Sequence, residues 1–262
     1  MKLPSSKLAF KLAFALTLTL APLLPAQTTT QKAPSASKPA APVILDPADQ
    51  PAPKKDPVTG QIQAGFQRMH ESFLKRGKEG PIGVLFIGDS ITQGWSGSGK
   101  KVWEESFSQY QPANFGISGD RTQHVLWRIA NGELDGIKPK VVVLMIGTNN
   151  SAYPTEDIIK GDLAIVAAIH QKLPDAKLLL LAIFPRGAEA SNPARAKLKA
   201  VNEALAKLDD GKRTRHLDIG GKFLDASGNI PKDIMPDALH PNAKGYEIWA
   251  AAIKAPLAEM MK

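Results

Sequence analysis

The chain has 262 residues, of which 43% are hydrophobic, with a formal net charge of +8 and no cysteine. The length allows one large domain or two small ones, and the lack of cysteine excludes both disulfides and a lipid anchor on cysteine. Residues 1–56 hold seven lysines and three aspartates, which is half of the net charge, and no basic stripe with interleaved aromatic residues follows. This distribution argues against nucleic acid as a partner.

The first 26 residues have the pattern of a secretory signal peptide. Lysines at positions 2, 7 and 11 flank or precede an apolar stretch, Leu12–Leu24, and the small residue Ala26 comes just before Gln27. This pattern predicts cleavage after Ala26, export to the periplasm or beyond, and no stable membrane insertion afterwards. The alternative is an uncleaved anchor, but the apolar stretch is short for a membrane span.

Residues 27–57 are rich in proline, alanine, threonine, serine and lysine, and they contain almost no aromatic residue. A segment of this composition cannot bury enough apolar surface to offset its chain entropy. We therefore expect a disordered spacer that can be deleted with little effect, and a single folded domain at residues 58–262.

The domain is predicted to begin with a helix over Val58–Arg76, because Ile62, Phe66, Met69 and Phe73 recur at helical spacing. His70 lies beside this stripe and is interpreted as structural. Five apolar runs then predict buried strands, at 84–87, at the start of 113–120, and at 141–146, 177–184 and 215–219. Helical periodicity alternates with them, at 102–107, 122–130, 155–172, 193–208 and 242–258. The fold class is therefore α/β, with a parallel sheet of about five strands covered on both faces.

Polar residues follow the predicted strands where ligands bind in open α/β folds. Ser90, Gly119 and Asn149 each stand just after a strand, and a late loop carries Asp237 and His240. A serine hydroxyl needs a base to act as a nucleophile, which His240 can supply while Asp237 orients its ring. The N–H groups of Ser90 and Gly119 and the side-chain amide of Asn149 are candidate donors for an oxyanion.

Each of these residues also has a structural interpretation when it is taken alone. Ser90 or His240 can cap a helix, Gly119 can relieve a bend, and Asn149 can order a turn. A binding module without catalysis is a further alternative, in which Gly119–Thr122 hold an anion at a helix N-terminus. The occurrence of all the blocks in order, each at a strand end or helix start, favours catalysis.

These blocks resemble those of the SGNH (GDSL-type) hydrolases. The residues that carry the resemblance are Gly88-Asp89-Ser90, Gly119, Gly147-Thr148-Asn149 and Asp237-x-x-His240. The likeness is greatest to the catalytic subunits of intracellular platelet-activating factor acetylhydrolase, through residues 114–128, 131–134, 138–141 and 185–187. It implies a flavodoxin-like three-layer α/β/α fold, a Ser90-Asp237-His240 triad, and oxyanion donors at Ser90, Gly119 and Asn149.

The resemblance leaves the substrate open. An exported member of this superfamily is more similar to carbohydrate acetylesterases, so we expect hydrolysis of short-chain esters, acetyl esters above all, on a small molecule or a glycan. A lipid acylhydrolase or a thioesterase is the alternative. No cofactor is implied, and no metal, because histidines and carboxylates do not cluster at ligand spacing beyond Asp237 and His240.

Overall fold

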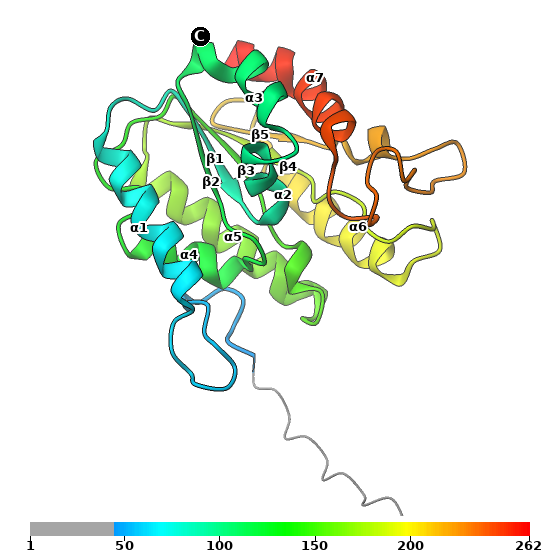
Figure 1. The fold of residues 1–262 in the computed structure, drawn as a ribbon, viewed down its shortest axis with the longest axis horizontal. Coiled ribbons are helices and arrows are strands. Elements are labelled where there is room, and N and C mark those ends of the chain that lie inside the picture. Colours follow the sequence, from blue (N-terminus) through cyan, green and yellow to red (C-terminus); the bar gives the residue numbers. More distant parts are fainter. Residues whose placement is uncertain (1–44) are drawn as a thin grey trace, which may run out of the picture. The chain divides into compact units, whose positions relative to one another are not determined.

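The structure, a computed structural model, describes residues 45–262. The expected signal peptide and residues 27–44 of the expected spacer lie outside the described residues. Five parallel strands form one sheet in the order β2-β1-β3-β4-β5 (Figure 1). This order is the flavodoxin-like one, so the predicted fold class is confirmed. The strands are β1 (Val84–Gly88), β2 (Pro112–Gly116), β3 (Val141–Met145), β4 (Lys177–Leu181) and β5 (Thr214–Leu217).

Helices cover both faces of the sheet and divide the core into two layers. The residues of each strand alternate between the layers, so that Leu85 and Ile87 enter one while Val84 and Phe86 enter the other. The first layer is closed by α1 (Ala64–Lys78), α4 (Thr122–Ala130), α5 (Thr155–Lys172) and α6 (Pro193–Leu205). The second layer is closed by α2 (Ser90–Gln93), α3 (Lys100–Phe107) and α7 (Ala243–Met260). Among residues 45–262, no helix combines the length and the apolarity that a membrane crossing requires.

The predicted helices at 122–130 and 155–172 have the observed bounds, whereas three strands are shorter than predicted. β3, β4 and β5 end at residues 145, 181 and 217. Ile183 and Phe184 are buried although they lie beyond the end of β4. An apolar run indicates buried residues rather than paired strand residues. The predicted strands are too long because residues stay buried after the last paired residue. Leu163, an apolar residue on α5, is 40% exposed.

The first predicted helix begins six residues later than expected. Val58 is 91% exposed and Ile62 is 40% exposed, and both precede the first turn of α1. Asp56 Oδ1 instead accepts the N–H groups of Val58 (3.0 Å) and Thr59 (2.8 Å), and Lys55 pairs with Ile62 in an antiparallel bridge. An aspartate that binds the N–H groups following it favours a turn over a helix.

Residues 45–57 are not a spacer, and this part of the domain prediction is wrong. Ala48 and Ala52 are buried, and the Ala52 N–H donates to the Gln123 carbonyl oxygen (3.1 Å). The Ala48 carbonyl oxygen accepts from Thr122 Oγ1 (2.7 Å), and the Asp46 carbonyl oxygen accepts from Tyr153 Oη (2.8 Å). We call residues 45–57 the strap. Its two buried apolar side chains, Ala48 and Ala52, are small, so composition concealed that its backbone is bound to the domain.

Candidate active site

Ser90 stands at the carboxyl end of β1, in the middle of the sheet. The chain turns sharply between Gly88 and α2, and a Cβ on Gly88 would collide with Thr92 and with the Met145 carbonyl oxygen. Asp89 caps the short helix, because its Oδ1 accepts the Ile91 N–H (2.9 Å). This tight turn presents the partly exposed Ser90 hydroxyl at the edge of the sheet.

His240 and Asp237 come to Ser90 from the loop before α7. Ser90 Oγ lies 2.8 Å from His240 Nε2, and His240 Nδ1 lies 2.6 Å from Asp237 Oδ2. Asp237 Oδ1 accepts the N–H groups of Leu239 (3.1 Å) and His240 (2.8 Å). Ala238 has a φ of +56°, and this conformation lets the backbone of residues 238–240 curl around the Asp237 carboxylate. The structure thus brings the three residues into one hydrogen-bonded chain.

The electrostatics of this chain suit proton transfer. Partial burial acts to raise the pKa of Asp237, but hydrogen bonds from the His240 backbone and ring, and from the Leu239 N–H, outweigh it and lower the pKa. An ionised Asp237 against Nδ1 keeps the proton there and leaves Nε2 able to accept one from Ser90. The arrangement can therefore activate a serine hydroxyl.

Gly119 and Asn149 lie close to each other, because Asn149 binds the residue that follows Gly119. Gly119 occupies the third position of a turn that the Asp120 N–H closes onto the Ile117 carbonyl oxygen (3.1 Å), with a φ of +73° that favours glycine. Asn149 Nδ2 donates to the Asp120 carbonyl oxygen (2.9 Å). Within residues 45–262, the N–H groups of Ser90 and Gly119 donate to no protein acceptor. Both N–H groups are therefore available to a ligand.

The N-terminus of α4 is not arranged to hold an anion, which removes the support for the binding-module alternative. The Arg121 N–H donates to His124 Nδ1 (3.1 Å), and the Thr122 N–H donates to Asn150 Oδ1 (3.1 Å). Burial, followed by the positive charges of Lys54, Arg121 and Arg128, lowers the pKa of His124 to about 3, so its ring remains an acceptor.

Arg186 lies in the 185–187 segment that contributes to the family resemblance, but no motif in the sequence marks it as part of the site. Arg186 Nη1 donates to the Thr148 carbonyl oxygen (2.7 Å), and the Gly187 N–H donates to the Ala238 carbonyl oxygen (2.9 Å). The loop after β4 therefore joins the Asn149 turn to the Asp237–His240 loop. A cavity of about 390 Å³ lies here, lined by Ser151, Arg186, Gly187, Asn192, Ala194, Asp237, Ala238 and Leu239.

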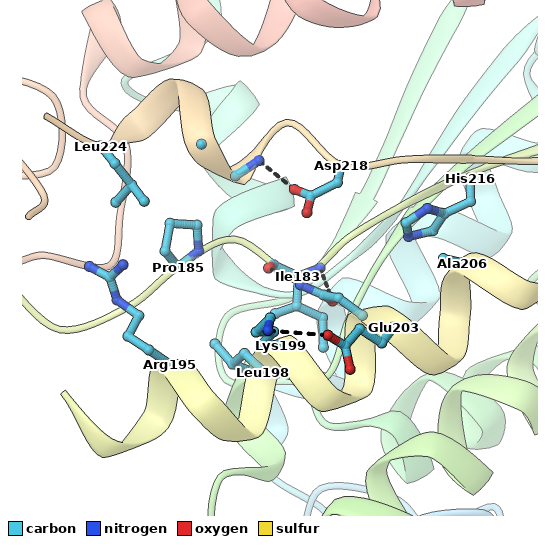
Figure 2. A pocket seen from close by; sticks show the side chains of 13 residues that line it. Ile183, Pro185, Arg195, Leu198, Lys199, Glu203, Ala206, His216, Asp218 and Leu224 are labelled. Carbon is cyan, nitrogen blue, oxygen red and sulfur yellow. Dashed lines mark hydrogen bonds and ion pairs between the residues drawn. The ribbon is translucent and has the colours of Figure 1, made fainter. Parts of the chain in front are cut away.

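A second cavity, of about 620 Å³, lies apart from Ser90 and His240. It is bounded by α6 and by the residues in and after β5, with Lys199 and Glu203 on one wall and His216 and Asp218 on another (Figure 2). None of the three residues of the Ser90 chain lines it.

Two buried carboxyl groups interact with each other, one on Asp89, directly before Ser90, and one on Asp162. Burial raises the pKa of Asp89 to about 7, even though the Ile91 N–H bond acts in the opposite direction. Asp162, on α5, is 1% exposed, and neither of its carboxyl oxygens has a hydrogen-bond partner among the described residues. Burial first, and the charge of Asp89 second, raise the pKa of Asp162 well above its ordinary value. A buried carboxyl without partners destabilises the fold when it ionises.

We expect Asp162→Asn to be more stable than the unsubstituted protein at alkaline pH. A raised pKa means that the native state binds the proton more tightly than the unfolded state, and this stabilisation is lost as pH rises from 3.8 to the raised value. The advantage of asparagine should grow by up to about 1.4 kcal/mol per pH unit across that window. Urea unfolding at pH 5 and pH 8 measures it, with Asp175→Asn at an exposed position as the control. An equal gap at both pH values would contradict the argument.

Comparison with known proteins supports an ester hydrolase. Residues 86–248 match the GDSL-like lipase/acylhydrolase family model. Platelet-activating factor acetylhydrolase IB subunit alpha1 from Bos taurus is 37% identical over 217 residues, covering 82% of this chain and 91% of that subunit. Subunit alpha2 from Rattus norvegicus is 42% identical over 197 residues, covering 75% and 83%.

Solved structures share the fold at lower identity. A GDSL-like lipase from Bacteroides thetaiotaomicron has a TM-score of 0.58 and 21% identity, covering 72% of this chain and 97% of that one. An acetyl-xylooligosaccharide esterase from Geobacillus has a TM-score of 0.51 and 18% identity, covering 68% and 93%. The resemblance drawn from the sequence is confirmed. Because the family model spans more than half of the chain and both subunits align with most of it, the chain belongs to the GDSL-like lipase/acylhydrolase family and is a hydrolase of esters.

Proposed function

We propose that this protein is a serine esterase that removes short acyl groups, acetyl above all, from a polar alcohol such as a sugar. The observation that carries the proposal is the hydrogen-bonded chain from Ser90 Oγ through His240 to Asp237, at 2.8 and 2.6 Å. Ser90 is the nucleophile, His240 the general base and then acid, and Asp237 the group that orients the ring.

In the acylation step, Ser90 Oγ bonds to the ester carbonyl carbon while its proton passes to His240 Nε2. The carbonyl oxygen becomes negative and accepts hydrogen bonds from the N–H groups of Ser90 and Gly119 and from the Asn149 amide. When the carbon–oxygen bond to the alcohol breaks, His240 returns the proton to the leaving oxygen. Water then attacks the acyl-serine by the same sequence, releasing the acid and restoring Ser90.

The preference for a polar alcohol rests on the cavity beside Asp237. Ser151, Arg186, Asn192 and Asp237 supply polar groups to its wall, and a long acyl chain would need an apolar groove instead. The names of the similar proteins, an acetylhydrolase subunit and an acetyl-xylooligosaccharide esterase, are consistent with an acetyl group. Because the similar subunits are named platelet-activating factor acetylhydrolases, a lipid ester is the second candidate substrate.

The proposal is tested with p-nitrophenyl esters of increasing chain length and with an acetylated xylooligosaccharide. We expect kcat/KM to be highest for the acetate and to fall at least about tenfold by the octanoate, because the polar groups that line the cavity beside Asp237 give longer chains little added apolar contact. Acetate release from the oligosaccharide should exceed that from an acetylated glycerophospholipid. Faster hydrolysis of long-chain esters would favour the lipid acylhydrolase instead, and no hydrolysis of any ester would refute the proposed function.

A further inference from the structure

The turn that carries Gly119 can adopt two orientations of its central peptide. Residues Ile117–Asp120 form the turn, so the central peptide joins the Ser118 carbonyl group to the Gly119 N–H. In a trans peptide these two groups point in opposite directions. Glycine at the third position also tolerates rotation of this peptide by half a turn, because both signs of φ are open to it. The direction of the Gly119 N–H is therefore set by whatever binds the Ser118 carbonyl oxygen.

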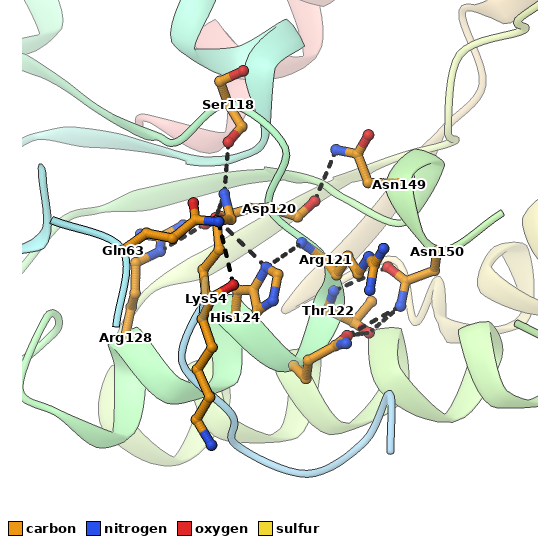
Figure 3. Close-up of polar contacts among 12 residues, drawn as sticks. Lys54, Gln63, Ser118, Asp120, Arg121, Thr122, His124, Arg128, Asn149 and Asn150 are labelled. Atoms are coloured by element: carbon orange, nitrogen blue, oxygen red, sulfur yellow. Dashed lines mark hydrogen bonds and ion pairs between the residues drawn. The ribbon is translucent and has the colours of Figure 1, made fainter. Parts of the chain in front are cut away.

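Lys54, on the strap, binds that oxygen. Its Nζ donates to the Ser118 carbonyl oxygen at 2.6 Å and lies 2.8 Å from Asp120 Oδ1, so that it contacts the residues on both sides of Gly119 (Figure 3). The Lys54 side chain is 13% exposed, and its Nζ lies 5.6 Å from the centre of the Phe66 ring. A lysine ammonium that is largely removed from water and has two anionic or carbonyl partners is held in one position.

The rest of the turn is anchored to the groups around Ser90. The Ile117 N–H donates to the Gly88 carbonyl oxygen (3.2 Å), directly before Asp89 and Ser90. The Ser118 N–H donates to Gln93 Oε1 (3.0 Å), and Asn149 binds the Asp120 carbonyl oxygen. The Asp120 carboxylate, fully buried, also accepts from Arg128 Nε (3.0 Å). The Asp120 carboxylate thus has Arg128 as well as Lys54, whereas among residues 45–262 the central peptide is bound by Lys54 alone.

We propose that Lys54 is a positioning residue that holds the Ser118–Gly119 peptide with its N–H directed at the oxyanion. The inference rests on the proposed function, because it assigns the strap a part in that same site. When the Ser118 carbonyl oxygen is bound to Lys54, the Gly119 N–H points away from the strap and donates to no group of the described protein. The strap thus completes the active site as well as the fold.

Lys54→Met in the full-length protein tests this inference, since methionine keeps the apolar stem and removes the charge. We expect kcat for p-nitrophenyl acetate to fall about 10- to 100-fold, as misplacement of a catalytic group by about 1 Å can do. KM should change less than about twofold, because an oxyanion contact forms mainly in the transition state. Lys54→Arg should recover most of kcat. Lys55→Met, at the exposed neighbouring position, is the matched control and should behave as the unsubstituted protein.

A second readout separates positioning from a merely structural role. A cavity of about 260 Å³ beside Lys54, lined in part by Phe66, Gln93 and Ser118, can admit a small amine. Ethylammonium should therefore raise kcat of Lys54→Ala several-fold while leaving that of Lys55→Ala unchanged. If Lys54→Met does not fold, Lys54→Ala, which also lacks a donor for the Ser118 oxygen, is judged by the same kcat and KM comparison, with the ethylammonium rescue as its readout.

The inference is overturned if Lys54→Met or Lys54→Ala keeps full kcat per folded molecule, or if Lys54→Met loses only melting temperature. It is also overturned if KM alone changes. These outcomes are distinct from failure of the proposed function, in which the unsubstituted protein itself hydrolyses no ester. The number of reactive sites in each variant is counted by labelling with a serine-directed phosphonate, so that a folding defect cannot be mistaken for a loss of kcat.

Discussion

Replacing Ser90 with alanine is expected to lower kcat for p-nitrophenyl acetate by roughly 10⁶-fold, as removal of the nucleophile does in serine proteases. Ser90 is partly exposed and its hydroxyl makes one side-chain contact, with His240 Nε2, so its loss should leave the melting temperature nearly unchanged. Circular dichroism and steady-state kinetics measure both quantities. Ser96→Ala, at an exposed position a short distance along the chain, is the control.

A serine-directed phosphonate should also label the active protein at Ser90, and peptide mapping by mass spectrometry locates the label. Retention of more than a small fraction of activity in Ser90→Ala would show that another group attacks the ester. Active protein that resists labelling would lead to the same conclusion. Either result would leave the family assignment in place, because that assignment rests on the family match and the related sequences rather than on the role of Ser90.

Asp237→Asn is expected to lower kcat/KM by up to about 10⁴-fold. Asparagine can still accept the N–H groups that Asp237 Oδ1 binds, so the loop should keep its shape. An amide against His240 Nδ1, however, favours the ring form that carries its proton on Nε2, where Ser90 needs an acceptor. Rate measurements on Asp237→Asn and on His240→Ala separate the orientation of the base from its presence.

The same variant should move the acidic limb of the pH profile to lower pH. The lowered pKa of Asp237 keeps this carboxylate ionised through the assay range, so the asparagine variant removes a full negative charge beside the base. A negative charge beside a base favours its protonated form, so removal of the charge extends the active form of the enzyme to lower pH. If Asp237→Asn loses little rate while His240→Ala is inactive, Asp237 is not essential for orienting the base, and the proposed esterase function still stands. An unmoved limb together with full activity in His240→Ala would place the base elsewhere.

Local pattern was enough to predict the sheet and the helices that pack on it. Helical spacing predicted the observed bounds of α4 and α5, and the apolar runs predicted five strands. The same runs overestimated the ends of β3, β4 and β5, because buried residues continue past the last paired residue. Since parallel strands end at one edge, their order along the chain also placed Ser90, Gly119 and Asn149 together.

The sequence by itself thus determined the fold class and the candidate nucleophile and base, because these depend on periodicity and on residue types at strand ends. Only the tertiary structure decided the part played by the strap. Lys54 lies 64 residues before Ser118, and nothing near it in sequence marks it as a partner of that carbonyl oxygen. The exposed Val58 and the buried Asp162, whose carboxyl group has no partner among residues 45–262, likewise contradict what local pattern favours. Contacts between distant segments depend on how the layers pack, and no period in the sequence records which backbone groups they bring together.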